Sequence, residues 1–392
     1  MKIAMLTVDY LPNIGGITGH IYHVSHALRK LGQEVVVVNP VPRDRPGIER
    51  FEEGGVPGYR CGFVSHGNRL RRVWCRAQAG LQGLSCAAAD FGGLDILHQH
   101  DHYTSTPAAR LFGGHAAWVW TNHTSRFQRN FEKPLLRGAL PWIYRGVKGI
   151  ISVSPDRFEK TKVVWGDRVP LAYIPNGVDT TRFHPEVRAN RAQFDLAADD
   201  FVVLCPNRMT PMKGALYLAQ AVNKILQRSS QARWRFVFLG SDLAVNTDAD
   251  YVASVRKELE PAFQRGCVRY LGNIPMAQMP EINALADVIV LPSLWDAVSL
   301  SALESLASRR AVVATNVGGL PEVVRPDETG LLVPPKDPEA LAKAILRFHD
   351  DAALREHCAA TAARLTVENY SWNKIAERTL MFYKKITGKD RN

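Results

Sequence analysis

Two cations lie five residues apart on a loop that follows a predicted buried strand. The apolar run Phe201–Cys205 precedes Arg208 and Lys213, and Gly214 then leads into a helical pattern. An arginine fork and a lysine ammonium can both bind one diphosphate group. Two solvated surface cations would give the same spacing, so the pair alone leaves both interpretations open.

Carboxylates flank the start of a helix that the sequence predicts near Ser299. Asp296 lies in the loop after the apolar run Val288–Leu291, and Glu304 lies in the helix itself. The loop carboxylate can accept hydrogen bonds from sugar hydroxyls, and the helix carboxylate can hold both hydroxyls of a ribose. The free backbone N–H groups around Ser299 and Leu300 can face phosphates. A helix-dipole acid beside an exposed glutamate is the alternative.

A pair of glycines, Gly15 and Gly16, follows the first predicted strand and opens a helix. Glycines allow the backbone to approach a ligand closely, and a helix N-terminus offers N–H groups to an anion. The Gly-x-Gly-x-x-Gly spacing of dinucleotide-binding loops is absent. A phosphate-binding loop and a plain tight turn therefore stay open as alternatives.

Histidines gather after another predicted strand, at His98, His100 and His102, with Asp101 among them. Histidines at this spacing can ligate a metal. They can also contact an acceptor through His100 or Asp101, or pack as a structural cluster. The sequence leaves acceptor contact and packing as equal alternatives.

Cations and aromatic side chains alternate over residues 126–148, and arginines occupy positions 69, 71, 72 and 76. Such a face could dock on anionic lipid and bring the protein to a lipid-linked acceptor. Arg126 is the candidate acceptor-binding residue within it. A solvated surface with its aromatic rings packed inward is the alternative. No nucleic-acid-binding module is recognisable, so nucleic acid is not an expected partner.

The composition is typical of a globular chain with a basic first half. Its 392 residues are 46% apolar and 22% charged, and this length predicts two domains. Residues 1–185 carry 23 Lys and Arg against 14 Asp and Glu, whereas residues 186–392 carry 26 against 24. The excess predicts an anionic partner for the first half. The six cysteines form no Cys-x-x-Cys pair, which favours reduced thiols over zinc ligands.

Short apolar strands alternate with helices throughout, which predicts parallel sheets covered by helices on both faces. We therefore predict an α/β fold of two Rossmann-like, doubly wound domains, 1–185 and 186–370, that face a central cleft. A last helix within 371–392 is expected to cross back to the first domain. No run of apolar residues is long enough to span a membrane, and the first residues indicate a strand rather than a signal peptide. We expect a cytoplasmic protein with possible peripheral membrane contact.

The order and spacing of these segments resemble the family 4 glycosyltransferases of the GT-B fold. The resemblance covers nearly the whole chain and is carried by Gly15-Gly16, Asp95-Ile96-Leu97-His98-Gln99-His100, Thr121-Asn122-His123, the linker 174–179, Arg208 with Lys213-Gly214, Leu239-Gly240, the run 292–304 and Val317-Gly318-Gly319-Leu320-Pro321-Glu322. It implies a retaining transferase that uses a nucleotide diphosphate sugar, with no metal or other cofactor. UDP-sugar is the first choice of donor and GDP-mannose the second. The acceptor would be a saccharide, a lipid-linked saccharide or a small molecule.

The resemblance also implies a role for each matched residue. The diphosphate would be held by Arg208 and Lys213, the transferred sugar by Asp296 and the ribose by Glu304. His123 would lie near the transferred sugar and the reacting centre, and Gly16 would contact a phosphate. The backbone of Gly272 and Ile274 would bind the edge of the base.

Two departures from the family pattern bear on specificity. Asp296 replaces the usual Glu, and Ala297-Val298-Ser299 replaces Gly-Phe-Gly, so side chains stand where backbone approaches the sugar. Two alternatives to the transferase are a sugar-nucleotide epimerase or sugar phosphorylase on the same fold, and a degenerate protein that binds sugar nucleotides without catalysis.

Overall fold

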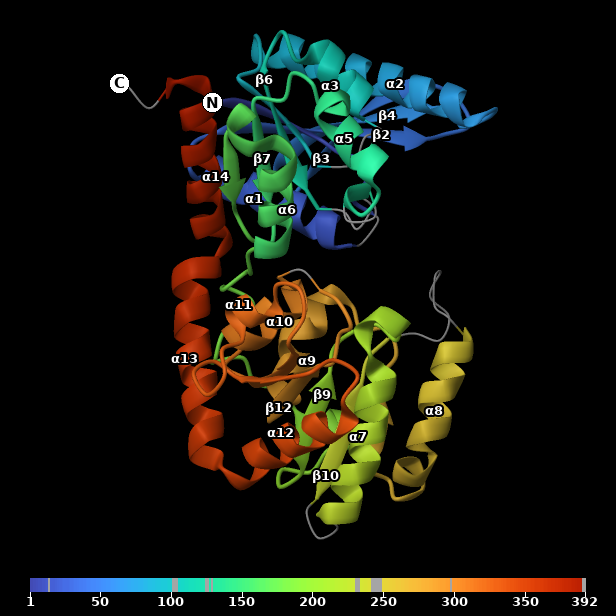
Figure 1. The fold of residues 1–392 in the computed structure, drawn as a ribbon, viewed down its shortest axis with the longest axis vertical. Helices are drawn as coiled ribbons and strands as arrows, with labels where there is room; N and C mark the ends of the chain where they lie inside the picture. The colour runs from blue at the N-terminus through green and yellow to red at the C-terminus, as the bar shows by residue number, and fades with distance from the viewer. Residues whose placement is uncertain are drawn as a thin grey trace. The chain divides into compact units, whose positions relative to one another are not determined.

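The computed structural model describes residues 1–12, 15–100, 105–123, 127, 130–229, 233–240, 249–296 and 298–389. The chain forms two compact units, Met1–Asn176 with Trp372–Asn392, and Gly177–Ser371 (Figure 1). The division falls before the predicted residue 185. The reason is that Val178 and Phe183 are buried in an apolar cluster of the second unit.

The first unit is built on an eight-stranded sheet of order β3-β4-β2-β1-β5-β6-β7-β8. Its strands are β1 (Lys2–Leu6), β2 (Glu34–Pro42), β3 (Gly47–Glu53), β4 (Val56–Phe63), β5 (Ile96–Gln99), β6 (Ala117–Asn122), β7 (Gly149–Ser152) and β8 (Leu171–Tyr173). Its helices are α1 (Gly16–Lys30), α2 (Arg69–Phe91), α3 (Thr106–Phe112), α5 (Pro134–Ile143), α6 (Pro155–Trp165) and α14 (Trp372–Thr387).

The strands β3 and β4 form an antiparallel hairpin at the edge of this otherwise parallel sheet. The sequence does not predict this hairpin. None of the seven residues of β3 is buried, so the strand lacks the apolar run that marks a buried strand in a sequence. The hairpin adds one antiparallel pair to the edge of the predicted parallel sheet.

In the sequence, Ile21, Val24, Leu28 and Leu31 are spaced three, four and three residues apart, which predicts one apolar helix face, and helix α1 has this face. Ile21, Val24 and Leu28 are fully buried, as expected for residues spaced three and four apart on one side of a helix. The last helix, α14, packs beside α1 in the first unit.

The second unit contains a six-stranded parallel sheet of order β11-β10-β9-β12-β13-β14. Its strands are β9 (Phe201–Cys205), β10 (Trp234–Phe238), β11 (Val268–Tyr270), β12 (Val288–Leu291), β13 (Ala311–Thr315) and β14 (Leu331–Val333). Its helices are α7 (Ala215–Arg228), α8 (Ala249–Gln264), α9 (Met279–Leu285), α10 (Leu300–Ala307), α11 (Leu320–Val323), α12 (Pro338–Asp350) and α13 (Ala352–Tyr370). Both units thus have the doubly wound α/β architecture that the sequence predicts.

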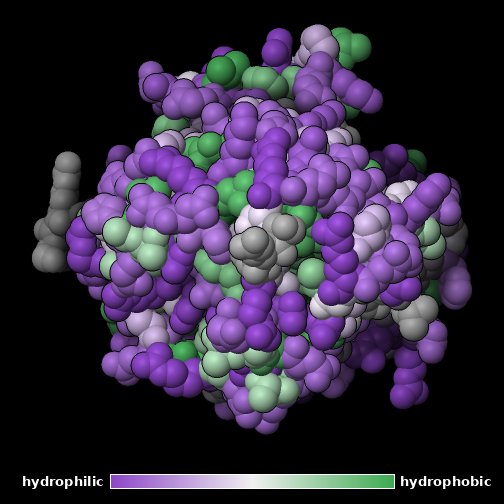
Figure 2. Space-filling model, turned by 90° about the horizontal axis from the view of Figure 1, so that it is seen from below, coloured by the Kyte–Doolittle hydropathy of each residue, from purple (hydrophilic) through white to green (hydrophobic). Residues whose placement is uncertain are grey.

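The apolar side chains gather between sheet and helices. One cluster fills the first unit, and two clusters lie in the second. Figure 2 shows one face of the molecule, on which hydrophilic side chains predominate and apolar ones form small separate patches. Among the described helices, none combines the length and apolar character that crossing a membrane requires.

Candidate functional site

The second unit presents its predicted cations on the loop that follows β9. Arg208 is exposed, and its guanidinium has no partner among the described residues. The short 3-10 turn Pro211–Lys213 comes next and ends at Gly214, which has a positive φ of 70°. The loop lies at the carboxyl end of a parallel strand, where ligands of such sheets bind.

Lys213 and Asp296 form an ion pair between two neighbouring strand ends. The Lys213 Nζ donates to Asp296 Oδ2 at 2.6 Å, and the Ser293 hydroxyl donates to the same oxygen at 3.3 Å. The two charged side chains are only 23% and 14% exposed. Since β12 pairs with β9, the sheet brings the two side chains together. The sequence alone assigns them to different parts of a ligand, Lys213 to a diphosphate and Asp296 to sugar hydroxyls.

Two glycines allow these loops to approach closely. A Cβ at Gly214 would lie 1.9 Å from the carbonyl oxygen of Pro292, and a Cβ at Gly318 would lie 1.7 Å from that of Asp296. Gly318 also has a φ of +57°, which favours glycine. The position of the Asp296 carboxylate therefore depends on the backbone of the loop after β13.

The loops after β10 and β11 lie at the same edge. The Gly240 N–H donates to the carbonyl of Gly272 at 2.9 Å, and a Cβ at Gly240 would lie 3.2 Å from the Cα of Arg208. Ile274 is partly buried against the apolar cluster behind this edge. The structure thus places the predicted base-reading segment next to the predicted diphosphate loop.

Helix α10 begins at Leu300, and Ser299 is its N-cap, in extended conformation with no side-chain cap. The first N–H groups of a helix have no acceptor within it, so they are available at this end. The spacing of Leu300, Leu303 and Leu306 in the sequence predicts that all three face the core. Leu303 and Leu306 are buried, but Leu300 is only half-buried. The prediction that Leu300 faces the core is wrong, because this first helical residue lies at the open end of the sheet.

Glu304 lies half-buried in α10, and its carboxylate has no partner within the described part of the chain. Burial raises the pKa of Glu304 to about 7, and the charge of Arg182 opposes this shift. The folded chain therefore favours the protonated carboxyl. Its contribution to folding stability is present at low pH and is lost as pH rises through about 7.

We expect the affinity for a nucleotide sugar to fall as pH is lowered through about 7, because only the ionised Glu304 is a bidentate acceptor for two ribose hydroxyls. The limit is about tenfold per pH unit. Calorimetric titration between pH 5.5 and pH 8.5 measures this dependence. Glu304→Gln should bind more weakly at high pH and show a flat profile. An unchanged pH slope in this variant would remove Glu304 from donor binding.

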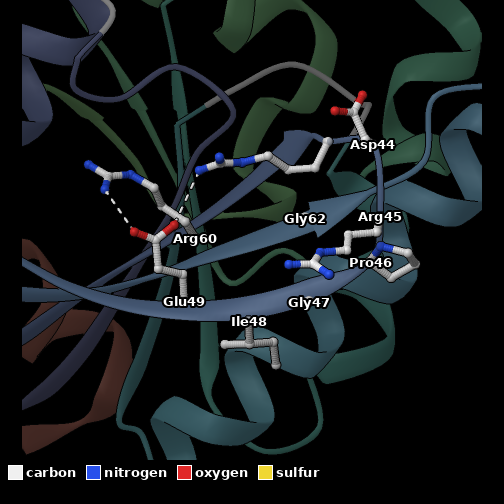
Figure 3. A pocket seen from close by; sticks show the side chains of 9 residues that line it. Asp44, Arg45, Pro46, Gly47, Ile48, Glu49, Arg60 and Gly62 are labelled. Atoms are coloured by element: carbon white, nitrogen blue, oxygen red, sulfur yellow. Dashed lines mark hydrogen bonds and ion pairs between the residues drawn. The ribbon is translucent and has the colours of Figure 1, made fainter.

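A hollow in the first unit is lined by Arg43, Arg45 and Arg60 on the edge that carries the hairpin (Figure 3). Glu49 pairs with two of them, at 3.2 Å from the Arg43 guanidinium and 3.8 Å from that of Arg60. Asp44 also lines the hollow. These acids offset most of the positive charge, so the hollow is a weak candidate for an anion site.

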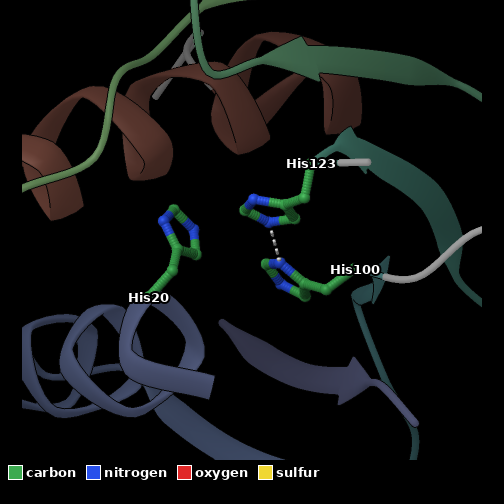
Figure 4. A group of neighbouring side chains, drawn as sticks. All are labelled: His20, His100 and His123. Atoms are coloured by element: carbon green, nitrogen blue, oxygen red, sulfur yellow. Dashed lines mark hydrogen bonds between the residues drawn. The ribbon is translucent and has the colours of Figure 1, made fainter. Parts of the chain in front are cut away.

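Three histidines converge at the centre of the first unit's sheet (Figure 4). His20 comes from α1, and His100 and His123 follow β5 and β6. The His100 Nδ1 and the His123 Nε2 lie 3.1 Å apart in a hydrogen bond. His20 Nδ1 lies 3.1 Å from Asn176 Oδ1, to which it donates. The rings could hold a metal ion, since their ligand atoms all lie within 4.8 Å of one another.

Burial keeps these histidines neutral near pH 7. It lowers the pKa of His20 to about 4, and together with the neighbouring histidines it holds the pKa of His100 and His123 well below the usual range. His123 is half-buried, whereas His20 and His100 are buried. His123 is thus the member of the cluster that can offer a neutral ring nitrogen to a substrate.

The structure favours packing over acceptor contact for the other histidines. His98 is held between Tyr383 and Thr121, with distances of 2.5 and 2.6 Å from its ring nitrogens to their hydroxyl oxygens. His100 is fully buried, and its Nε2 faces the sulfur of Met5. Asp101 and Arg126, the other candidate acceptor-binding residues, and His102 lie outside the described residues, as does Ala297.

Gly15 and Gly16 lie exposed at the start of α1, with Gly15 as its N-cap. A Cβ at either position would meet no described atom within 4 Å. The packing of the described residues therefore does not require glycine at either position, and the phosphate-binding loop and the tight turn stay open as alternatives.

Two residues near these sites were missed from the sequence. Asn207 is buried next to Arg208, and its Nδ2 has no hydrogen-bond partner among the described residues. His20 lies four residues before Val24 on the buried face of α1. A histidine on an otherwise apolar helix stripe was the signal that could have identified it.

Two family models match the chain. The model described as Glycosyltransferase Family 4 matches residues 14–182, and the model described as Glycosyl transferases group 1 matches residues 186–365. A D-inositol 3-phosphate glycosyltransferase from Kineococcus radiotolerans is 30% identical, over 98% of this chain and 95% of the relative. An uncharacterized glycosyltransferase from Methanocaldococcus jannaschii is 29% identical over 98% of both chains.

The fold is also found among solved structures. The Anabaena protein HepE, in complex with UDP-glucose, superposes with a TM-score of 0.76 at 18% identity, covering 98% of this chain and 100% of that chain. This likeness shows the GT-B fold. The chain belongs to the group 1 glycosyltransferases of the family 4 type, and it is a glycosyltransferase built on that fold.

Proposed function

We propose that the chain is a retaining glycosyltransferase that takes a hexosyl or N-acetylhexosaminyl unit from a nucleotide diphosphate sugar. The observation that carries the proposal is the strand-end edge of the second unit. There the Lys213–Asp296 pair, the open N-terminus of α10 and the unpartnered Glu304 carboxylate share one end of the sheet. They match the phosphate, sugar and ribose of such a donor in charge and hydrogen-bonding character.

We assign a role to each of these groups from the charge that develops on the donor during transfer of the sugar. Glycosyl transfer passes through an oxocarbenium-like transition state, and the departing diphosphate gains negative charge. Lys213, Arg208 and the N–H groups at the start of α10 would stabilise that charge most strongly in the transition state. The neutral His123 of the first unit would contact the transferred sugar near the reacting centre.

UDP-sugar is the first choice of donor and GDP-mannose the second. The complex of HepE with UDP-glucose supports the first choice. The proposed acceptor is a saccharide, a lipid-linked saccharide or a small molecule in cell-envelope, polysaccharide or glycoconjugate biosynthesis. Contact of the basic first half with an anionic membrane belongs to the same proposal, because it would give access to lipid-linked acceptors.

The proposal requires no metal. Two cations of the second unit would offset the diphosphate charge. In the histidine cluster of the first unit, the hydrogen bond between His100 and His123 requires a proton on one of the two facing nitrogens. A metal ion would have to displace this proton, so the hydrogen bond and a metal ion bound to both facing nitrogens exclude each other.

A donor panel assay in EDTA tests this function. UDP-, GDP- and ADP-sugars are incubated with and without a panel of saccharide acceptors, and the products are analysed by mass spectrometry. We expect one donor to give a glycosylated product only when an acceptor is present. A changed sugar released without acceptor would indicate an epimerase. Nucleotide sugar bound in calorimetry but converted to no product would indicate the degenerate protein. Activity restored only by added divalent metal would contradict the metal-free mechanism.

A further inference from the structure

Helix α5 of the first unit exposes apolar side chains to solvent. Leu135 is 91% exposed, Leu136 42% and Trp142 67%, and Leu140 is the only residue of the helix that is buried. Leu111 on α3 is 60% exposed. Soluble proteins rarely gather exposed apolar side chains of this size without a binding role.

The helices α3 and α5 form one surface at this point. The Arg110 guanidinium of α3 lies 5.7 Å from the centre of the Trp142 ring of α5, and the two helices lie side by side in Figure 1. We name the exposed side chains of Leu111, Leu135, Leu136 and Trp142 the apolar face.

Cations surround the apolar face. Lys133, Arg137, Arg145 and Lys148 are exposed, and Glu132 is the only acidic residue between positions 130 and 148. The start of α2 repeats this combination, with Leu70 and Trp74 80% and 57% exposed and with arginines at 69, 71 and 72.

We infer that the first unit docks on an anionic phospholipid bilayer through the apolar face and its surrounding cations. Tryptophan is enriched where a protein enters the interface of a bilayer, and clustered Lys and Arg bind anionic headgroups. A second copy of the same surface would bring like charges together, which disfavours self-association. The inference deepens the membrane contact within the proposed function, and it places the first unit at the surface where a lipid-linked acceptor resides.

Vesicle sedimentation with the full chain tests the inference in the absence of donor and acceptor, so its failure leaves the transferase assignment standing. The protein should sediment with vesicles of phosphatidylcholine and phosphatidylglycerol in equal parts, and not with phosphatidylcholine alone. Raising the salt concentration should weaken binding. The double variant Leu135→Glu/Trp142→Glu should bind at least about tenfold more weakly. Arg137→Glu/Arg145→Glu should lose the preference for anionic vesicles.

Val163→Glu is the matched control, because Val163 is 68% exposed on α6 of the same unit. It should bind vesicles like the unaltered chain, and all variants should keep the same thermal midpoint. Absence of binding to anionic vesicles, or equal binding by Leu135→Glu/Trp142→Glu, would overturn the inference. A dimer in light scattering that this double variant abolishes would assign the face to self-association instead.

Discussion

Lys213→Ala is expected to lower kcat by a factor of about 10²–10³, as found when one group that stabilises developing negative charge is removed from an active site. The same loss is expected for Arg208→Ala. In the folded chain Lys213 holds the Asp296 carboxylate at 2.6 Å. Its removal therefore takes away a phosphate contact and also frees the carboxylate that would meet the sugar. Initial rates at saturating donor, measured by released nucleotide, give this number.

Lys224→Ala is the matched control, since Lys224 lies on α7 of the same unit and, among the described residues, pairs with Glu339 alone, at 3.7 Å. It should leave kcat unchanged. Circular dichroism and thermal midpoints should show that all three variants fold. If Lys213→Ala and Arg208→Ala turn over at near-normal rates, these residues do not hold the diphosphate.

Gly318→Ala is expected to destabilise the second unit by about 3 kcal/mol. A positive φ on a residue other than glycine costs about 1 kcal/mol or more, and overpacking adds about 1–3 kcal/mol. Here the added Cβ would lie 1.7 Å from the carbonyl oxygen of Asp296, so one of the two loops must move. Calorimetry should show a Tm lower by about 6–12 °C, and donor affinity should fall because Asp296 shifts with its loop.

Gly266→Ala separates the cost of the positive φ from the cost of the close contact with Asp296. Gly266 has a φ of +68° in the same unit, and a Cβ there would meet no described atom within 4 Å. It should cost only the φ penalty, about 1 kcal/mol. Equal losses of Tm in the two variants would show that the close contact with Asp296 contributes nothing.

The sequence predicts best where a local pattern determines the structure. The helix start at Ser299 was identified from a short apolar strand, a polar loop and a leucine repeat, all of which lie within twenty residues. The apolar stripe of α1 was equally local. The existence of these helices depends mainly on neighbouring residues, whereas the half-burial of Leu300 depends on its place at the end of the sheet.

Contacts between segments that are distant in the chain could not be predicted from a single sequence. The Lys213–Asp296 pair joins residues 83 apart, and it follows from the pairing of β12 with β9. Likewise the histidine cluster requires β5 and β6 to lie beside each other and α1 to pack against their ends. The order of the strands in a sheet depends on the whole domain. Residue spacing in the sequence therefore identified the candidate site residues but not which of them contact one another.

The resemblance to a known family predicted the roles of residues whose side-chain chemistry alone allowed more than one interpretation. Arg208 and Glu304 alone were compatible with a solvated surface. The structure places both residues at one end of the sheet, where Arg208 is exposed and the Glu304 carboxylate is half-buried without a partner among the described residues, and their roles in donor binding stay predictions. Asn207 was missed because an asparagine after a strand is ordinary in a turn, and only its burial without a partner marks it.

A crystal structure with a hydrolysis-resistant nucleotide sugar tests the central claim most directly. The account predicts diphosphate oxygens within hydrogen-bonding distance of Lys213, Arg208 and the first N–H groups of α10, with the ribose hydroxyls on Glu304. A nucleotide bound at another place on the chain, or bound here without contact to either cation, would contradict it.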